Sequence, residues 1–319
     1  MLITLEEIEQ ARKELPPEVV YTPVLQSGAI SDQTGADVWL KAENLQVTGS
    51  YKTRAAYTIL NRLSADQKRK GAAISSSGNL ATAFAYMGTL LGIPTAIVMM
   101  EKTSPYKVQR TMEYGAEAVL CENHNQARWD TLDRLGRERG ITAINTWEDA
   151  NVVRGHGSIG AEIMEQAPDL DAVIVPVSSG GLIGGVATAV KTLNPAVKVI
   201  GVQPEGSQAV YRSFLKKEIC EVPEPDTVCD SLVAPRPGDL TFEHVMAYVD
   251  EMVLVSDEQA IEAVKYLIGT MKLVVEPGGA VGVAALLNGI VKLEGKKVVA
   301  LLSGGNIMPE QLAGYLGGA

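Results

Sequence analysis

The chain has 319 residues, of which 46% are hydrophobic and 21% are charged, a composition typical of soluble globular proteins and a length that suggests two domains. Its formal net charge of −10, without runs of lysine or arginine, argues against a nucleic-acid partner. No apolar stretch of about 18 or more residues is present, and the acidic N-terminal stretch is unlike a signal peptide, so we expect a cytoplasmic protein without a membrane partner.

Cysteines and histidines are few and scattered. Their positions are Cys121, Cys220, Cys229, His124, His156 and His244. The cysteines lack CxxC spacing, which fits a reducing compartment, and the histidines do not suggest a ligand triad. We therefore expect no metal site.

A lysine at the start of a predicted helix is the first candidate for a functional residue. Ser50 is expected to cap this helix, Lys52 falls on its apolar face, and Arg54 falls on its wettable side. A lysine near a helix end usually extends its ammonium group into water. Alternatively, a desolvated lysine has a lowered pKa, and its neutral amine can form a Schiff base. This segment alone leaves both interpretations open.

Residues 71–146 alternate short apolar runs with helical patterns. We expect strands at residues 72–75, 95–100, 116–120 and 141–145, and helices at about 79–91, 105–114 and 126–138. Such a series predicts a parallel sheet with helices on both faces.

A second series of the same kind follows from about residue 155. We expect helices at residues 158–167, 182–193, 257–269 and 278–290, strands at 172–177, 198–203, 252–256 and 297–303, and a long proline-rich loop at 219–240. The predicted fold is α/β, with two open twisted sheets that carry helices on both faces. The large domain is expected to comprise residues 1–70 and 147–319, and the small α/β domain residues 71–146.

Three loops rich in Ser, Gly and Asn follow predicted strands, where open parallel sheets bind ligands. Residues 75–79 offer hydroxyl groups, an amide and the free N–H groups of a helix start, which suit a carboxylate. Residues 178–182 allow backbone N–H groups to converge on a phosphate. The third loop is residues 303–306. Each loop alone could be a tight turn, but the three loops together with Lys52 predict a ligand site.

Residues 155–160, GHGSIG, match the GxGxxG pattern of dinucleotide-binding loops. The preceding residues make a poor strand, and no acidic residue is suitably placed after a second strand. We interpret this segment as the beginning of a helix.

Several motifs together resemble the serine/threonine dehydratases, which are fold-type II pyridoxal-phosphate (PLP) enzymes. Residues 43–52, ENLQVTGSYK, are similar to that family's ENLQ-x-TGSFK motif, and SSGN, SSGGL, GHGSIGAEI, VVEPGGA and LLSGGN follow in the family's order. The resemblance covers about residues 20–306. It implies the tryptophan synthase β-like fold, with PLP bound in the large domain.

The resemblance implies a role for each candidate residue. Lys52 would bind PLP through its amine and then remove the α-proton of the substrate. Asn79 would hydrogen-bond the 3-hydroxyl group of the cofactor, and Ser303 would face its pyridine nitrogen. Ser77 matches the serine that acts on the opposite face of Cα in serine racemases. The phosphate group would contact Ser178, Ser179, Gly180, Gly181 and Leu182. The substrate carboxylate would contact Ser76, Ser77, Gly78, Asn79 and Leu80.

The implied reaction eliminates the β-hydroxyl group of a serine- or threonine-like amino acid and yields a 2-oxo acid and ammonia. An amino acid is then the small-molecule partner, and a homodimer or higher homo-oligomer is expected. An amino-acid racemase of the same fold and a non-catalytic sensor of PLP or amino acids are the alternatives. Production of a 2-oxo acid from any amino acid would exclude the sensor.

Some positions depart from the family's pattern. These positions are Leu80 for a histidine, Ser178 and Ser179 for two glycines, and Ser231 for the glycine of a DG pair. Gln203 and Ala209 stand where metal-activated relatives have acidic residues, so we expect activity that is independent of Mg²⁺ and Ca²⁺.

Overall fold

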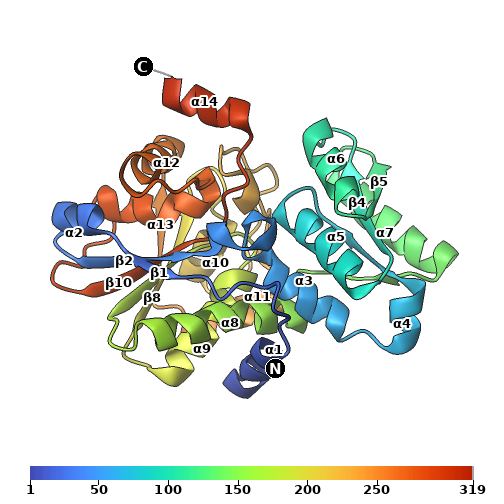
Figure 1. Cartoon of the computed structure of the whole chain (residues 1–319), viewed down its shortest axis with the longest axis horizontal. Coiled ribbons are helices and arrows are strands. Elements are labelled where there is room, and N and C mark those ends of the chain that lie inside the picture. The colour runs from blue at the N-terminus through green and yellow to red at the C-terminus, as the bar shows by residue number, and fades with distance from the viewer. Residues whose placement is uncertain (318–319) are drawn as a thin grey trace.

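The computed structural model describes residues 1–317 and contains two open sheets with flanking helices (Figure 1). The six-stranded sheet has the order β1 (Val24–Gln26), β2 (Asp37–Ala42), β10 (Lys297–Leu302), β7 (Ala172–Pro176), β8 (Lys198–Pro204) and β9 (Glu251–Val255). All neighbouring strands in it are parallel except the β1–β2 pair. The four-stranded parallel sheet has the order β5 (Glu117–Cys121), β4 (Thr95–Met100), β3 (Ala72–Ser75) and β6 (Thr142–Ala143).

Helices connect most of these strands. The first seven are α1 (Leu5–Lys13), α2 (Gly28–Thr34), α3 (Lys52–Asn61), α4 (Ala65–Lys70), α5 (Asn79–Leu91), α6 (Pro105–Glu113) and α7 (Asn125–Arg139). The others are α8 (Ala150–Gln166), α9 (Gly181–Leu193), α10 (Ala209–Lys216), α11 (Asp239–Tyr248), α12 (Asp257–Met271), α13 (Pro277–Leu287) and α14 (Pro309–Gly317). Short 3₁₀ turns are η1 (Glu43–Leu45), η2 (Val47–Gly49) and η3 (Asp230–Leu232). Within residues 1–317, every helix is too short or too polar to serve as a membrane span.

The large sheet separates two hydrophobic cores, because successive side chains of a strand point to opposite faces. In β10, Val298, Ala300 and Leu302 pack into the core that includes α12 and α13. Val299 and Leu301 pack into the other core, which includes α8 and α9. The predicted α/β fold with two helix-covered sheets is therefore confirmed.

Most predicted elements are confirmed, and the differences lie mainly in short or unusual segments. The strand expected at residues 141–145 has only two residues. The three-residue strand β1 and the six-residue strand β2 were not predicted. The domain boundaries remain a prediction, although all four strands of the small sheet lie within residues 71–146.

The interpretation of residues 155–160 as the beginning of a helix is wrong, because α8 begins at Ala150 and they lie in its interior. Glycine is required there for close packing between helices. A Cβ atom on Gly155 would lie 2.7 Å from the Cα atom of Ala55 in α3. Helix α3 also packs against α5, so it lies between the two sheets and contacts elements of both (Figure 1).

Candidate active site

A cavity of about 280 Å³ lies where α3 and the two strand-to-helix loops meet. Lys52, all of residues 76–80 and all of residues 178–182 line it. The carboxyl ends of the parallel strands bring these segments together although they are far apart in the sequence. From the third predicted loop, residues 303–306, only Asn306 lines this cavity; among the residues with a predicted role, the one that does not line it is Ser303. It is buried at the end of β10, and its carbonyl group accepts a hydrogen bond of 3.1 Å from the Tyr51 N–H.

Lys52 is the first residue of α3 and is half-buried in the cavity wall. The prediction that Ser50 caps this helix is wrong, because Tyr51 occupies the N-cap position and no side chain accepts from the first turn. Ser50 instead forms an isolated bridge with Gly304. Among residues 1–317, Lys52 Nζ has no hydrogen bond or ion pair, and it lies 4.5 Å from the centroid of the Tyr51 ring. Its amine is therefore available to a ligand.

The loop at residues 76–80 presents the start of α5 to the cavity, and no side chain caps that helix. The Ser77 hydroxyl lies 3.0 Å from Thr103 Oγ1, which donates to it. Leu80 is partly buried and packs against the hydrophobic core of the small sheet. The free N–H groups of the first helical turn and the dipole of α5 can hold a carboxylate at this position.

The side-chain amide of Asn79 is oriented by Glu276, which we did not predict, and by Asn306 from the predicted loop 303–306. Asn79 Nδ2 donates to Glu276 Oε1 at 2.8 Å, and Asn79 Oδ1 accepts from Asn306 Nδ2 at 2.8 Å. The second N–H of the amide remains free to donate to a ligand. The sequence signal for Glu276 was its position immediately before the Pro-Gly-Gly start of α13.

Glu276 is a buried acid that forms no ion pair within residues 1–317. Burial raises the pKa of its carboxyl group, the negative charge of Asp230 raises it further, and the neighbouring Ser231 and Asn79 side chains offset only part of the rise. The Ser231 hydroxyl also lines the cavity and is buried without a well-aligned hydrogen bond among residues 1–317. Buried titratable groups with perturbed pKa values in a cavity are typical of functional sites.

The loop at residues 178–182 is held in place by hydrogen bonds that two of its carbonyl groups accept from side chains. Gln203 Nε2 donates to the Ser178 carbonyl at 3.3 Å, and Thr241 Oγ1 donates to the Ser179 carbonyl at 2.6 Å. The hydroxyl groups of both serines take no part in these bonds. Gly180 has φ +97°, a left-handed conformation that glycine adopts without strain, and α9 begins immediately after it without a side-chain cap. This geometry suits an anion such as phosphate.

Gln203 is held by the protein through both ends of its side-chain amide. Besides its bond to Ser178, its Oε1 accepts from the Tyr211 N–H at 2.7 Å. Ala209 is buried at the start of α10. Among residues 1–317, no group of three His, Cys, Asp or Glu side chains is arranged to hold a metal ion. Independence from divalent metals remains a prediction.

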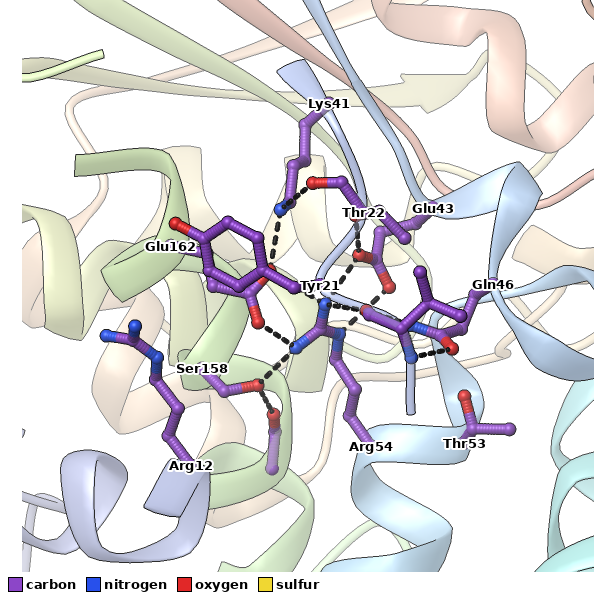
Figure 2. A network of polar contacts seen from close by, with 12 residues as sticks. Arg12, Tyr21, Thr22, Lys41, Glu43, Gln46, Thr53, Arg54, Ser158 and Glu162 are labelled. Carbon is purple, nitrogen blue, oxygen red and sulfur yellow. Dashed lines mark hydrogen bonds and ion pairs between the residues drawn. The ribbon is translucent and has the colours of Figure 1, made fainter. Parts of the chain in front are cut away.

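A buried ionic cluster lies beside the cavity, where Figure 2 shows Arg54 between Glu43 and Glu162. Arg54 Nε and Nη2 donate to Glu43 at 2.9 and 2.8 Å, and Nη1 donates to Glu162 Oε1 at 2.6 Å. Lys41 Nζ donates to Glu162 Oε2 at 2.6 Å. The prediction that Arg54 faces water is wrong, since its side chain is 0% exposed.

The charges of this cluster balance, with two cations and two carboxylates. Burial lowers the pKa of Arg54, but the charges of Glu43 and Glu162 outweigh burial and raise the pKa above its usual value. Burial raises the pKa of Glu43, but the charge and hydrogen bonds of Arg54 outweigh it, so the pKa of Glu43 is lowered. Arg54 and Glu43 are therefore charged, and the ion pairs of Arg54 join α3 and α8 to the segment after β2.

Comparison with known proteins gives consistent matches over nearly the whole chain. The family described as pyridoxal-phosphate dependent enzyme matches residues 15–304. L-threonine ammonia-lyase from Thermotoga maritima is 41% identical over 306 residues, which cover 96% of this chain and 76% of that protein. Maize serine racemase superposes with a TM-score of 0.93 at 32% identity, covering 99% of this chain and 97% of that one. The processed form of threonine deaminase isoform 2 from Solanum lycopersicum superposes with a TM-score of 0.91 at 30% identity, covering 99% of this chain and 94% of that one.

Proposed function

The chain belongs to the family of pyridoxal-phosphate dependent enzymes, and we propose that it is an ammonia-lyase that converts L-threonine, or a closely related β-hydroxy α-amino acid, to a 2-oxo acid and ammonia. The resemblance seen in the sequence is thereby confirmed at the level of the family. The observation that carries the proposal is the amine of Lys52, which has no partner among residues 1–317, in a cavity that two uncapped helix starts also face. The similarity to an L-threonine ammonia-lyase supports the substrate class.

The residues present fit pyridoxal phosphate. A free lysine amine can bind its aldehyde, and the start of α9 with residues 178–182 can bind its phosphate group. The free N–H of Asn79 can donate to its 3-hydroxyl group, because the rest of that amide is held by Glu276 and Asn306. Ser303 is proposed to face the pyridine nitrogen from the end of β10.

The side chains divide the chemistry between them. Bound PLP supplies an electron sink for the α-carbon of the amino acid. Residues 76–80 hold the carboxylate, which fixes the orientation of the Cα–H bond. The Lys52 amine accepts the α-proton, the bond from Cβ to the hydroxyl oxygen breaks, and the hydroxyl group leaves as water after gaining a proton. Water then replaces the amino group, so the net products are one 2-oxo acid and one ammonia.

A racemase is the second candidate, because Ser77 lies in the same cavity as Lys52 and because the fold matches that of maize serine racemase. In a racemase each face of Cα needs its own acid or base. Ser77 then exchanges a proton at the face opposite Lys52, and both substitutions abolish the reaction.

A panel of substrates separates the two candidates. Purified protein with PLP is incubated with L-threonine, L-serine and their enantiomers, and both the 2-oxo acid and the enantiomer composition are measured. We expect 2-oxo acid from the L-substrates, abolished in Lys52→Ala and reduced to a smaller extent in Ser77→Ala. Fast interconversion of enantiomers with little ammonia, lost in both variants, would contradict the lyase and support the racemase.

The proposal also includes a cytoplasmic homodimer or larger homo-oligomer. Closed symmetric homo-oligomers are the commonest assemblies of soluble enzymes. Light scattering of the purified protein measures its mass directly, and a value equal to the single-chain mass of 34.0 kDa would contradict this part.

A further inference from the structure

His156, in the interior of α8, is a buried histidine without hydrogen-bond partners in the described part of the chain. Its side chain lines the cavity, the residue is 2% exposed, and neither ring nitrogen has a hydrogen-bond partner among residues 1–317. Its ring packs against the Tyr51 ring in a tilted arrangement, with centroids 4.7 Å apart and an angle of 55° between the planes. A buried polar group without a partner destabilises the fold, so such a group calls for an explanation.

His244 is the natural comparison, because it is also buried but is fully partnered. The Ile3 N–H donates to His244 Nε2 at 3.1 Å, and Nδ1 lies 2.8 Å from Thr188 Oγ1. Both nitrogens of His244 are therefore used by the protein itself. The ring of His156, by contrast, keeps its hydrogen-bonding capacity for something inside the cavity.

The ring of His156 lies against the first residue of α9. A Cβ atom on Gly181 would lie 3.8 Å from His156 Nδ1 and 2.9 Å from Val152 Cγ1, so the glycine lets the start of α9 approach α8 at this point. The N-terminus of α9 has no side-chain cap and carries the positive end of the helix dipole. An anion at this position therefore meets both the free N–H groups of α9 and the imidazole.

The protonation state of His156 decides what it can offer. Burial lowers the pKa of His156 well below its usual value, and the charge of Lys52 lowers it further. The nearby Gly181 backbone acts on this pKa in the opposite direction and is outweighed. The ring is therefore neutral and has one N–H donor. A neutral donor beside an uncapped helix start suits an anionic oxygen, which accepts hydrogen bonds without requiring a second cation.

We propose that His156 donates its ring N–H to the phosphate group of the cofactor, as a further phosphate-binding residue beside residues 178–182. This inference rests on the proposed binding of PLP in this cavity. A substrate carboxylate shares the same anionic chemistry, so the test compares two forms of the cofactor that differ only in the phosphate group.

The test measures the dissociation constants of pyridoxal phosphate and of pyridoxal for the wild type and for His156→Phe. We expect His156→Phe to weaken the binding of pyridoxal phosphate about tenfold or more, the size of a hydrogen bond to a charged group, and to change that of pyridoxal less than about twofold. His156→Gln, which keeps an N–H donor, should recover most of the affinity for pyridoxal phosphate. In the control variant His244→Gln, both constants should change by the same factor.

Two results would overturn the inference: an equal loss for both ligands in His156→Phe, or no loss for either. A wild type that does not prefer pyridoxal phosphate to pyridoxal would instead contradict the proposed cofactor site itself. If His156→Phe does not fold, ¹⁵N-histidine NMR of the wild type gives the answer, because the chain has only three histidines. The His156 N–H signal should shift with pyridoxal phosphate and not with pyridoxal, and equal shifts with both ligands would overturn the inference.

Discussion

Helix α3 contributes to two buried polar regions that differ in whether their groups are partnered. Around Arg54, both cations and both carboxylates of the ionic cluster are paired within the protein. Around Lys52, within residues 1–317, the lysine amine, the His156 ring and the Ser231 hydroxyl have no partners. Arg54, whose charge is paired within the protein, therefore lies only two residues after Lys52, whose amine is available to a ligand.

Two buried glutamates show the same difference. Glu43 lies in the ionic cluster, where Arg54 outweighs the effect of burial and lowers the pKa of the glutamate. Glu276 lies at the cavity without an ion pair in the described part of the chain, and burial raises its pKa. Partnered buried charges stabilise a fold when their geometry is good, whereas unpaired ones destabilise it and are retained where function needs them.

The largest expected effect is that of Lys52→Ala on activity. Loss of the group that binds the cofactor and accepts the α-proton should lower the rate of 2-oxo acid formation by at least about 10²–10⁴-fold. The free energy of unfolding of the cofactor-free protein should change by less than about 1 kcal/mol, because the amine has no hydrogen bond or ion pair in the described part of the chain. A marked loss of stability would break the contrast between the two regions.

Arg54→Met should have the largest effect on stability. Removal of the guanidinium leaves Glu43 without an ion-pair partner and Glu162 with Lys41 as its only one. Breaking a buried ion pair in this way lowers the free energy of unfolding by about 3–5 kcal/mol. Urea unfolding measures this loss.

Arg139→Met is the matched control, since its pair with Glu117 is exposed, with side chains 46% and 51% accessible. Arg139→Met should lower the free energy of unfolding by less than about 1 kcal/mol. Equal losses in Arg54→Met and Arg139→Met would show that the buried cluster has no special role.

The two glutamates should respond to pH with opposite signs. The folded state binds the Glu43 proton less tightly than the unfolded chain does. The contribution of Glu43 to the free energy of unfolding is therefore present above the ordinary pKa of 4.5 and is lost as the pH falls. The folded state binds the Glu276 proton more tightly, so stability declines as the pH rises above 4.5.

Glu43→Gln should therefore lower the free energy of unfolding at neutral pH, whereas Glu276→Gln should raise it or leave it unchanged. Unfolding in urea at several pH values between about 4 and 8 measures both effects. A change of the same sign in the two variants would contradict the assignment of the two regions.

The smallest expected effect concerns Lys107 in α6, which pairs with Asp230 in η3 across the solvent-exposed edge of the cavity. Its side chain is 32% exposed and that of Asp230 is 55% exposed, so the pair contributes less than about 1 kcal/mol. Lys107→Ala should raise the KM for the amino acid less than about fivefold. Added salt should reduce the difference in KM between this variant and the wild type. Lys70→Ala, which removes an exposed pair with Asp66 outside the cavity, is the control and should leave KM unchanged.

Sequence periodicity predicted most of the strands and helices, because apolar runs and Gly or Ser boundaries are local signals. The loops at residues 76–80 and 178–182 could be placed together because parallel strands end at one edge of a sheet. Arg54 was misplaced because helical periodicity put it on the wettable side of its helix, and periodicity does not reveal that its partners lie at residues 43 and 162. His156 was missed for the same reason, because its lack of partners is a property of the tertiary structure.

Reduction with borohydride tests the central claim most directly, because it makes the bond between the cofactor and the protein permanent. The protein is purified with pyridoxal phosphate, reduced and digested, and the modified peptide is identified by mass spectrometry. We predict that the pyridoxyl group is found on Lys52 and that Lys52→Ala carries none. A label on another lysine, or an unlabelled Lys52 in protein that forms 2-oxo acid, would contradict the account.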